Sequence, residues 1–545
     1  MEKNKNTFSL VCIFALIFLI VFHFVNNYIW LSISKLPHYG CMPYHMVSSL
    51  KYLDILSYFK LKPCFLYEVL GVDFFYPPLF PFIASLTCLI FGKSTLVLVM
   101  SNLVFVAATF ISLYLIGRKM GDIRIGVLAA YILSFYPIFF YISRTFLLEI
   151  ALCSMVTITV LFLLYTEGFS KTRPSFILGL LLGFGMLTKQ SYVVFVLGPV
   201  VFLFFGTYLH SDAQLRKKIL INLLFSLFIG ICISSLWYLR HIRQMFPVLI
   251  NVVSDSGLVP YDIPLFSWRS FYFYFETFVN DQIVLFFFVL FIFAVLVMLI
   301  KKINRKLFYL FILWLVVPYF ILTLFNNKFF YYTLPCLPAV ALISSCGLVA
   351  IKRTWLRRIL IVMVFLVGFF HFFSASYYSG NSFGPFISVG KLKLRFFPFG
   401  MQRISLSYTP VGGEWNTQEI INKVVLSAKG ESVVVGVYNI DHNLFGKKKG
   451  FITDNYICAD FDYLNYSFML NNVDNCQIID LLHQENYYYL KNEVTYIISS
   501  ILLENGNVNK INVDNYSLIY VFTMADGSKV YLYKINKLLS LSSGQ

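Results

Sequence analysis

Residues 73–81 read Asp73-Phe74-Phe75-Tyr76-Pro77-Pro78-Leu79-Phe80-Pro81 and belong to a long segment, Ser34 to Lys93, between the first strongly apolar run and the next. The same segment contains Glu68 and the stretch Pro37-His38-Tyr39-Gly40-Cys41-Met42-Pro43-Tyr44-His45. In a chain that is otherwise nearly all apolar, such a loop is where polar chemistry can be housed. We therefore interpret the rest of the protein as a scaffold for this segment.

The composition excludes an ordinary soluble protein. Hydrophobic residues make up 59% of the chain and charged residues only 13%, whereas soluble domains have about 25% charged residues. The apolar run from Phe8 to Leu31 is too long for the core of a signal peptide, and no small-residue cleavage site follows it. The sequence therefore predicts a polytopic α-helical membrane protein whose first span stays as an anchor.

Apolar runs long enough to cross the hydrocarbon, which takes roughly 20 residues, recur along residues 1–376. We expect about eleven spans, near residues 8–31, 95–116, 125–142, 150–166, 175–188, 191–209, 219–238, 282–300, 307–325, 332–351 and 359–376. Only Thr188-Lys189-Gln190-Ser191 separates the fifth predicted span from the sixth.

Basic residues occur in alternate connections between the predicted spans. They are Arg118, Lys119 and Arg124; Lys171 and Arg173; Arg216, Lys217 and Lys218; Lys301, Lys302, Arg305 and Lys306; and Lys352, Arg353, Arg357 and Arg358. Positively charged loops of membrane proteins face the cytoplasm. We therefore expect a cytoplasmic N-terminus in the cell membrane, and outer loops at 34–94, 143–149, 239–281 and 326–331.

The net charge of +17 comes from the membrane half, because residues 380–545 hold 14 Lys and Arg against 14 Asp and Glu. This charge is interpreted as setting topology and contacting anionic lipid headgroups, and nothing in the sequence indicates a nucleic-acid partner.

Residues 377–545 have the composition of a soluble domain. A capped amphipathic helix after Asn416, strands at 432–438 and 494–499, and a hairpin of 517–523 with 529–534 predict a small α/β domain. We expect this domain to be extracytoplasmic.

The ten cysteines divide by their predicted depth. Those in or beside spans are interpreted as small apolar packing residues: Cys12, Cys88, Cys153, Cys232, Cys336 and Cys346. Cys41 and Cys64 share the first outer loop, and Cys458 and Cys476 share the outer domain, where an oxidising exterior would permit two disulfides. No Cys or His spacing resembles a closed zinc site.

Several short motifs occur in a characteristic order. They are Tyr76-Pro77-Pro78-Leu79 and Phe91-Gly92 in the first outer loop, residues Ser143 to Glu149, residues Gly185 to Gln190, and Lys328-Phe329-Phe330-Tyr331-Tyr332 before Pro335 and Pro338. This ordered set resembles the C-type glycosyltransferases, in the branch of protein O-mannosyltransferases and bacterial aminoarabinose transferases. The resemblance covers residues 1–376.

The resemblance implies transfer of a sugar from a polyprenyl-phosphate donor to a lipid, glycan or protein acceptor at the outer membrane face. Such a reaction needs a carboxylate to take the acceptor proton, and cations to hold the leaving phosphate. The predicted catalytic residues are Glu149, Asp73 and His45. The predicted substrate-binding residues are Arg144, Lys189, Lys328, Tyr76 and Glu68. No cofactor is required by these motifs, and a role for a divalent metal stays open.

Each role has a structural alternative. Glu149 and Arg144 could form an ordinary ion pair at the start of a helix, where a carboxylate suits the dipole. Asp73 could cap the helix that starts near Pro77. Lys189 and Lys328 could extend to lipid headgroups.

The sequence departs from the family in the first outer loop. Relatives usually carry an Asp a few residues before a Tyr or His, and the matching positions here are Gly40 and Cys41, ahead of Tyr44 and His45. Either the base has moved to His45, Asp73 or Glu68, or the catalytic step is lost and the chain is a non-catalytic scaffold. A lipid or solute transporter is the remaining alternative, although the span interiors hold only His23 and His371 as ionisable candidates.

The distribution of basic residues generates a test of orientation. With the native outer cysteines removed, Ala213→Cys lies in a predicted inner loop and Gly506→Cys in the outer domain. We expect an impermeant thiol reagent added outside intact cells to label the cysteine at 506 and not the one at 213. The reverse pattern would show that the predicted orientation is inverted.

Overall fold

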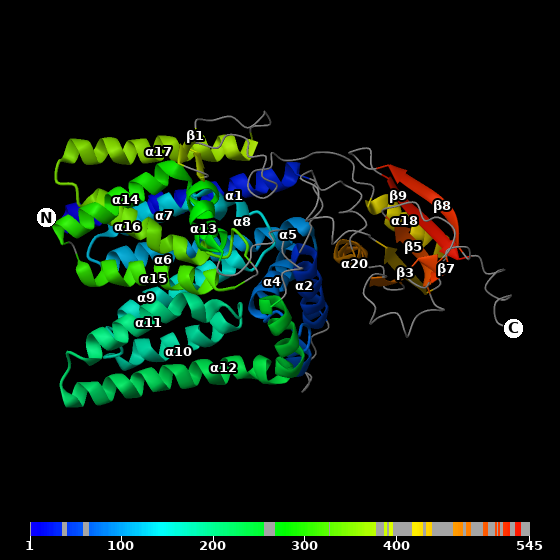
Figure 1. Cartoon of the computed structure of the whole chain (residues 1–545), viewed down its shortest axis with the longest axis horizontal. Helices are drawn as coiled ribbons and strands as arrows, with labels where there is room; N and C mark the ends of the chain where they lie inside the picture. The colour runs from blue at the N-terminus through cyan, green and yellow to red at the C-terminus, as the bar shows by residue number, and fades with distance from the viewer. Residues whose placement is uncertain are drawn as a thin grey trace.

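The fold is described from a computed structural model of the chain, over residues 2–34, 41–57, 65–254, 267–302, 304–325, 328–377, 386–389, 392–395, 417–428, 432–438, 461–471, 476–480, 494–499, 507–508, 511–512, 516–523 and 529–535. Figure 1 shows a large helical domain followed by a smaller domain that contains a β-sheet. The predicted disulfide partners Cys64 and Cys458 lie outside the described residues, as does Gly40.

Each of the eleven predicted spans coincides with a helix or a pair of consecutive helices. They are α1 (Glu2–Ile33), α5 (Thr95–Met100) with α6 (Asn102–Lys119), α7 (Ile123–Ser134) with α8 (Pro137–Ile142), α9 (Glu149–Tyr165), α10 (Thr172–Met186), α11 (Tyr192–Tyr208), α12 (Ala213–Ser254), α14 (Val284–Lys301), α15 (Arg305–Thr323), η2 (Leu334–Cys336) with α16 (Leu337–Val349), and α17 (Thr354–Tyr377). Six described helical segments are long and apolar enough to cross a membrane, and the others are shorter apolar helices. The predicted mostly helical membrane fold is confirmed.

Helix α12 differs from its prediction, because it continues well past residue 238. Its 42 residues extend about 60 Å, twice the hydrocarbon thickness of about 30 Å. Just past residue 238, the side chains of Arg240 and His241 hydrogen-bond to the carbonyls of Tyr67 and Leu70, so this part of α12 contacts the first outer loop.

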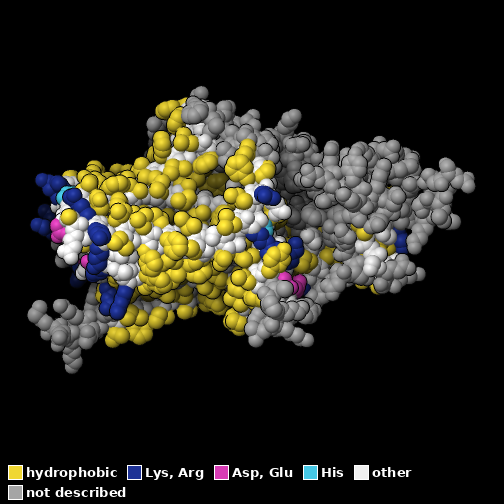
Figure 2. All heavy atoms as spheres, turned by 90° about the horizontal axis from the view of Figure 1, so that it is seen from below, with side chains coloured by type: hydrophobic (Ala, Val, Ile, Leu, Met, Phe, Trp, Pro, Cys, Tyr) yellow, Lys and Arg dark blue, Asp and Glu magenta, His cyan; other side chains and the backbone are white. Residues whose placement is uncertain are grey.

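The surface of the helical domain is that of a lipid-facing protein. Figure 2 shows apolar side chains over its body and a concentration of Lys and Arg at the end away from the C-terminal domain. Exposed apolar side chains follow one side of α12 at helical spacing, including Leu224, Phe228, Ile231 and Leu239. This distribution fits the expected topology, and the orientation itself stays a prediction.

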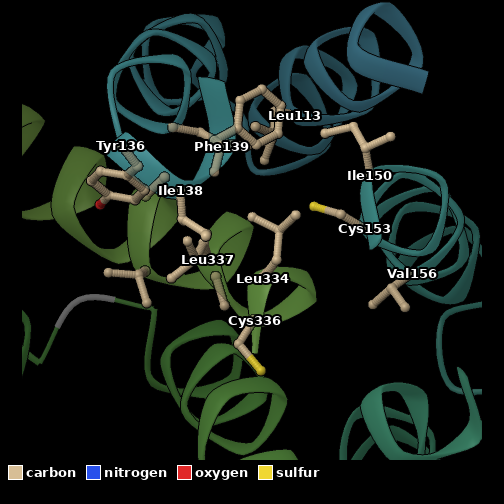
Figure 3. Packing of buried hydrophobic residues seen from close by; sticks show 14 of the residues in the cluster. Leu113, Tyr136, Ile138, Phe139, Ile150, Cys153, Val156, Leu334, Cys336 and Leu337 are labelled. Carbon is tan, nitrogen blue, oxygen red and sulfur yellow. The ribbon is translucent and has the colours of Figure 1, made fainter. Parts of the chain in front are cut away.

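The core of the helical domain is built from residues of several helices that are distant in sequence. Figure 3 shows Leu113 of α6, Phe139 of α8, Cys153 of α9 and Cys336 of η2 converging in one buried cluster. Five of the six cysteines predicted as packing residues are buried, and the sixth, Cys232, is exposed on α12.

The first outer segment, residues 34–94, contains three helices among its described residues. Its elements are α2 (Cys41–Ser57), α3 (Phe65–Leu70) and α4 (Leu79–Phe91). Helix α4 begins after Pro77-Pro78 and ends at Gly92, whose φ of 92° is in the left-handed region that suits glycine. Helix α2 packs on α4, so the two halves of this segment lie side by side.

The smaller domain contains a five-stranded sheet in the order β4-β3-β5-β9-β8. The strands are β3 (Val433–Tyr438), β4 (Cys476–Asp480), β5 (Val494–Ser499), β8 (Tyr516–Thr523) and β9 (Lys529–Ile535). β3 is parallel to β4 and β5, whereas β9 is antiparallel to β5 and β8. Helix α18 (Thr417–Ala428) packs its apolar side, including Ile420 and Val424, into the same core. These elements confirm the predicted α/β character.

Helix α20 (Phe461–Leu470) joins the two parts of the molecule. The ammonium of Lys93 donates to the carbonyl oxygen of Met469 at 2.6 Å, and the hydroxyls of Thr95 and Tyr466 are 2.5 Å apart. Tyr466 is buried in the core of the helical domain. Helix α20 also packs on α2, so the C-terminal domain contacts the first outer segment directly.

A close approach of α6 and α7 depends on two glycines. A Cβ atom added to Gly117 would lie 2.3 Å from the backbone nitrogen of Gly126, and backbone atoms cannot move aside as a side chain can. We expect Gly117→Ala to lower the unfolding free energy by about 1 to 3 kcal/mol, the cost of overpacking, measured as a lower Tm in detergent.

Gly206 of α11 is the matched control, since an added Cβ atom there meets no atom within 4 Å. Gly206→Ala should leave the Tm unchanged or raise it, because alanine favours a helix by up to about 1 kcal/mol over glycine. Equal Tm values for Gly117→Ala and the unmodified protein would contradict the close packing of α6 on α7.

Candidate active site

A buried ion pair joins two connections of the helical domain. The Lys189 ammonium lies 2.6 Å from Oε1 of Glu149, and the two side chains are 16% and 3% exposed. Glu149 is the first residue of α9, where the helix dipole favours a carboxylate. Lys189 is in the turn between α10 and α11, which the bond from the Thr188 N–H to the Gly185 carbonyl helps to close. The predicted partner Arg144 is therefore not the partner of Glu149.

Tyrosines surround this ion pair. The Lys189 ammonium lies 4.8 Å from the ring centre of Tyr332, within the range of a cation–π interaction. Burial raises the pKa of Tyr331 and of Tyr76 well above the usual value, and the Glu149 carboxylate contributes to both shifts. Their hydroxyls therefore stay protonated and can donate hydrogen bonds to an oxygen-rich ligand.

His45 of α2 lies against Tyr76. The two ring centres are 4.6 Å apart in an edge-on arrangement, and His45 is buried. Burial lowers the pKa of His45 to about 3, and the charge of Lys189 contributes. The imidazole is therefore neutral at physiological pH, and its Nδ1 has no hydrogen-bond partner among the described residues. We call Glu149, Lys189, Tyr76, Tyr331, Tyr332 and His45 the ion-pair cluster.

Asp73 organises the turn that carries Tyr76. Its Oδ1 accepts hydrogen bonds from the N–H groups of Phe75 and Tyr76 at 2.8 and 3.0 Å and from the Tyr44 hydroxyl at 3.0 Å. Its Oδ2 accepts from the Ser48 hydroxyl at 3.2 Å. Both oxygens of this buried carboxylate are thus engaged. Asp73 caps the turn at residues 74–76 and does not cap α4, which has no side-chain cap.

The outer turns of α12 hold this turn in place. The indole N–H of Trp237 donates to the Asp73 carbonyl at 3.1 Å, and the Tyr238 hydroxyl donates to the Met186 carbonyl at 3.0 Å. The Leu79 N–H donates to the Leu187 carbonyl at 2.9 Å, and the Gln190 amide donates to the Phe75 carbonyl. Residues 73–79 and 186–190 are therefore one connected unit, which brings Tyr76 and Lys189 together.

Sequence reasoning missed the contribution of Trp237 and Tyr332. Trp237 lies at the outer end of a predicted span, where aromatic residues are common for reasons of membrane anchoring. Tyr332 belongs to a motif that the sequence singled out for Lys328. Neither position carried a signal for its role, because each role depends on contacts with residues far away in the chain.

Three predicted substrate-binding residues lie outside the ion-pair cluster. Arg144 is buried between α1 and α17, donating to Asn27 Oδ1 at 3.0 Å and to Ser376 Oγ at 2.8 Å. Lys328 is buried and donates to the carbonyls of Thr323, at 3.0 Å, and Phe325, at the end of α15. Burial lowers its pKa. Glu68 is exposed on α3.

Cys41, one of the two positions that match the Asp of relatives, is close to the ion-pair cluster. Cys41 is the first residue of α2. Burial is the main cause of the raised pKa of Tyr76, and Cys41 is the next largest contributor. A thiol therefore stands where a carboxylate would face the tyrosines. Among the described residues, no group of three His, Cys, Asp or Glu side chains is arranged to hold a metal ion.

The chain is similar to a family of known proteins in sequence and to solved structures in fold. Residues 76–238 match a family model described as dolichyl-phosphate-mannose-protein mannosyltransferase. No curated protein matches the chain in sequence. A crystal structure of ArnT from Cupriavidus metallidurans in the apo state aligns with a TM-score of 0.57 at 12% identity, over 95% of this chain and 97% of that chain.

A second ArnT structure, bound to undecaprenyl phosphate, aligns with a TM-score of 0.53 at 11% identity, over 96% of this chain and 98% of that chain. The predicted resemblance to C-type glycosyltransferases is confirmed at the level of the fold, and the protein has the architecture of a multi-pass membrane protein.

The hydrogen bonds of Asp73 generate a prediction about local stability. Asp73→Ala removes four hydrogen bonds to a charged acceptor, and we expect it to lower the unfolding free energy by roughly 2 to 4 kcal/mol. Hydrogen exchange followed by mass spectrometry should show faster exchange at the amides of Phe75 and Tyr76. Asp73→Asn keeps the same shape and should cost less than half as much.

Glu68→Ala is the control for this prediction. Glu68 is an exposed acidic residue of the same outer segment, and its removal should change stability by no more than about 0.5 kcal/mol. Unchanged amide exchange in Asp73→Ala would show that the carboxylate does not organise the turn.

Proposed function

We propose that this protein transfers a sugar from a polyprenyl-phosphate donor to a lipid, glycan or protein acceptor at the outer face of the cell membrane. The observation that carries the proposal is the buried pair of Glu149 and Lys189 in an ArnT-like fold. The two residues supply the two charges that the reaction needs, a base for the acceptor and a cation for the leaving phosphate.

Glu149 is the proposed general base. As the acceptor oxygen bonds to the anomeric carbon of the sugar, its proton moves to the Glu149 carboxylate and the bond from that carbon to the phosphate oxygen breaks. The electron pair of the broken bond stays on the phosphate, whose negative charge therefore grows in the transition state. A buried carboxylate suits this role because its burial limits contact with bulk water.

Lys189 is the proposed phosphate-binding residue. Its side chain is partly exposed, whereas the ammonium of Lys328 is engaged by two backbone carbonyls. The protonated hydroxyls of Tyr76 and Tyr331 can donate to the remaining phosphate or sugar oxygens. A polyprenyl-phosphate donor is also supported by the undecaprenyl phosphate bound to the ArnT structure that shares this fold.

Asp73 and His45 receive positioning roles in this proposal. The Asp73 carboxylate is engaged by four donors, and the neutral His45 packs on Tyr76. With Gly40 and Cys41 at the positions that match the usual Asp, Glu149 is the carboxylate of the ion-pair cluster and takes the role of base. Cys41 also favours the second candidate function, a transferase-like scaffold without catalytic activity.

Sugar transfer in membranes supplied with a labelled polyprenyl-phosphate sugar tests the proposal. Glu149→Gln should lower kcat by about a hundredfold or more, the usual contribution of a general base. Lys189→Met removes a charge-assisted contact to the donor phosphate and should therefore weaken donor binding by roughly 1.5 to 3 kcal/mol. The expected result is a higher KM for the donor. Glu167→Gln, which changes an exposed acidic residue paired with Lys119 and Lys171, should behave as the unmodified protein.

The scaffold alternative predicts a different set of results. In that case the unmodified protein transfers no sugar from any prenyl-phosphate donor, and Cys41→Asp creates transfer activity. Full activity of Glu149→Gln would remove Glu149 from the reaction.

A further inference from the structure

We infer that Glu149 competes with the donor phosphate for Lys189, so that donor binding releases Glu149 and has to precede activation of the acceptor. This inference rests on the proposed function and adds to it an order of binding. It assigns Lys189 two partners in turn, a carboxylate in the empty site and a phosphate in the loaded one.

In the site without donor, the proposed base Glu149 is paired with Lys189. Lys189 is the one hydrogen-bond partner of the Glu149 carboxylate among the described residues, at 2.6 Å. Charge-assisted contacts of this length stabilise the ionised carboxylate. The carboxylate oxygen that accepts this contact is occupied by the ammonium and is therefore not free to take the proton of the acceptor hydroxyl. The pairs of Glu167 with Lys119 and Lys171 and of Asp122 with Arg124 involve exposed or partly exposed side chains, whereas Glu149 and Lys189 are 3% and 16% exposed.

Lys189 is able to change partners. It lies in a short turn between two helices, and its side chain is flexible and partly exposed, whereas Glu149 is buried at the start of α9. The ring of Tyr332 lies 4.8 Å from the ammonium and offers it a second favourable surface when it leaves the carboxylate. The sugar-linked phosphate of the donor carries one negative charge, and this charge grows as the bond to the sugar breaks, so the attraction of the ammonium to the phosphate increases along the reaction.

Release changes the chemistry of Glu149. Once Lys189 turns to the phosphate, the Glu149 carboxylate stays buried beside the tyrosines, and its Oε1 no longer accepts the hydrogen bond from the ammonium. It can then take the proton of the acceptor hydroxyl as the new glycosidic bond forms and the bond to phosphate breaks. After the prenyl phosphate departs, the proton leaves Glu149 for solvent and Lys189 returns to the carboxylate, which restores the starting pair.

The test is the affinity of the purified protein for undecaprenyl phosphate in detergent, without a sugar or an acceptor. Removing the competing carboxylate should strengthen binding. Glu149→Gln should therefore lower the Kd roughly tenfold, because the variant removes a charge-assisted hydrogen bond that only the unliganded protein makes. Lys189→Met should raise the Kd. The double variant Glu149→Gln with Lys189→Met should bind as Lys189→Met alone, because the competition requires the ammonium.

Two further variants complete the design. Glu149→Asp keeps the charge but withdraws the carboxylate by one methylene, so this variant should also bind undecaprenyl phosphate more tightly. It replaces Glu149→Gln in the test if the Gln variant has a lowered Tm. Glu167→Gln is the matched control for net charge. Glu167 pairs with Lys119 and Lys171 at an exposed position, and its removal should leave the Kd unchanged.

The outcomes separate this inference from the proposed function. If Glu149→Gln is folded and loses sugar transfer but binds undecaprenyl phosphate no more tightly than the unmodified protein, the competition is overturned while the proposed base stands. A gain in affinity that persists in the double variant, or that appears equally in Glu167→Gln, also overturns it, since general electrostatics would then explain the gain. Retained transfer in Glu149→Gln would reject the proposed function itself.

Discussion

The hydrocarbon interior of the membrane is the constraint on which the structure depends. It offers no water to unpaired backbone groups, so each crossing segment satisfies its own hydrogen bonds as a helix. Polar side chains that need partners are then concentrated where helices end. In this protein those ends supply Glu149 at the start of α9, Lys189 between α10 and α11, and Tyr331 before η2. The ion-pair cluster is assembled from such connections.

Polar contacts between distant segments hold these connections in register. Asp73 gathers the turn at residues 74–76, and Trp237 holds the Asp73 carbonyl from the long outer extension of α12. Gln190 and Leu79 tie that turn to the connection that carries Lys189. Arg144 performs a comparable task between α1 and α17 through Asn27 and Ser376. A charged side chain can thus be essential to the site without touching a substrate, because buried charges need partners and therefore fix the segments that provide them.

The first outer segment links the two parts of the molecule. Its α2 carries His45 on one side and contacts α20 of the C-terminal domain. Lys93 and Thr95, which follow α4, bond to Met469 and Tyr466 of α20. The C-terminal domain thus rests on the same elements that shape the ion-pair cluster.

The sequence by itself determined the helical architecture and four of the five strands of the C-terminal sheet, because apolar length and hydrophobic periodicity are local properties. Strand β4 was not predicted. Glu149 and Lys189 could be selected as candidates, but their pairing could not, because 40 residues separate them and Arg144 is much nearer in the chain. Only the tertiary structure decided this, since the packing of α9, α10 and α11 turns Glu149 toward Lys189 while Asn27 and Ser376 take up Arg144. Likewise, Asp73 reads as a carboxylate available for catalysis until the fold brings Tyr44, Ser48 and two backbone amides to its oxygens. Partner choice is a property of which helix ends meet, and no local pattern encodes it.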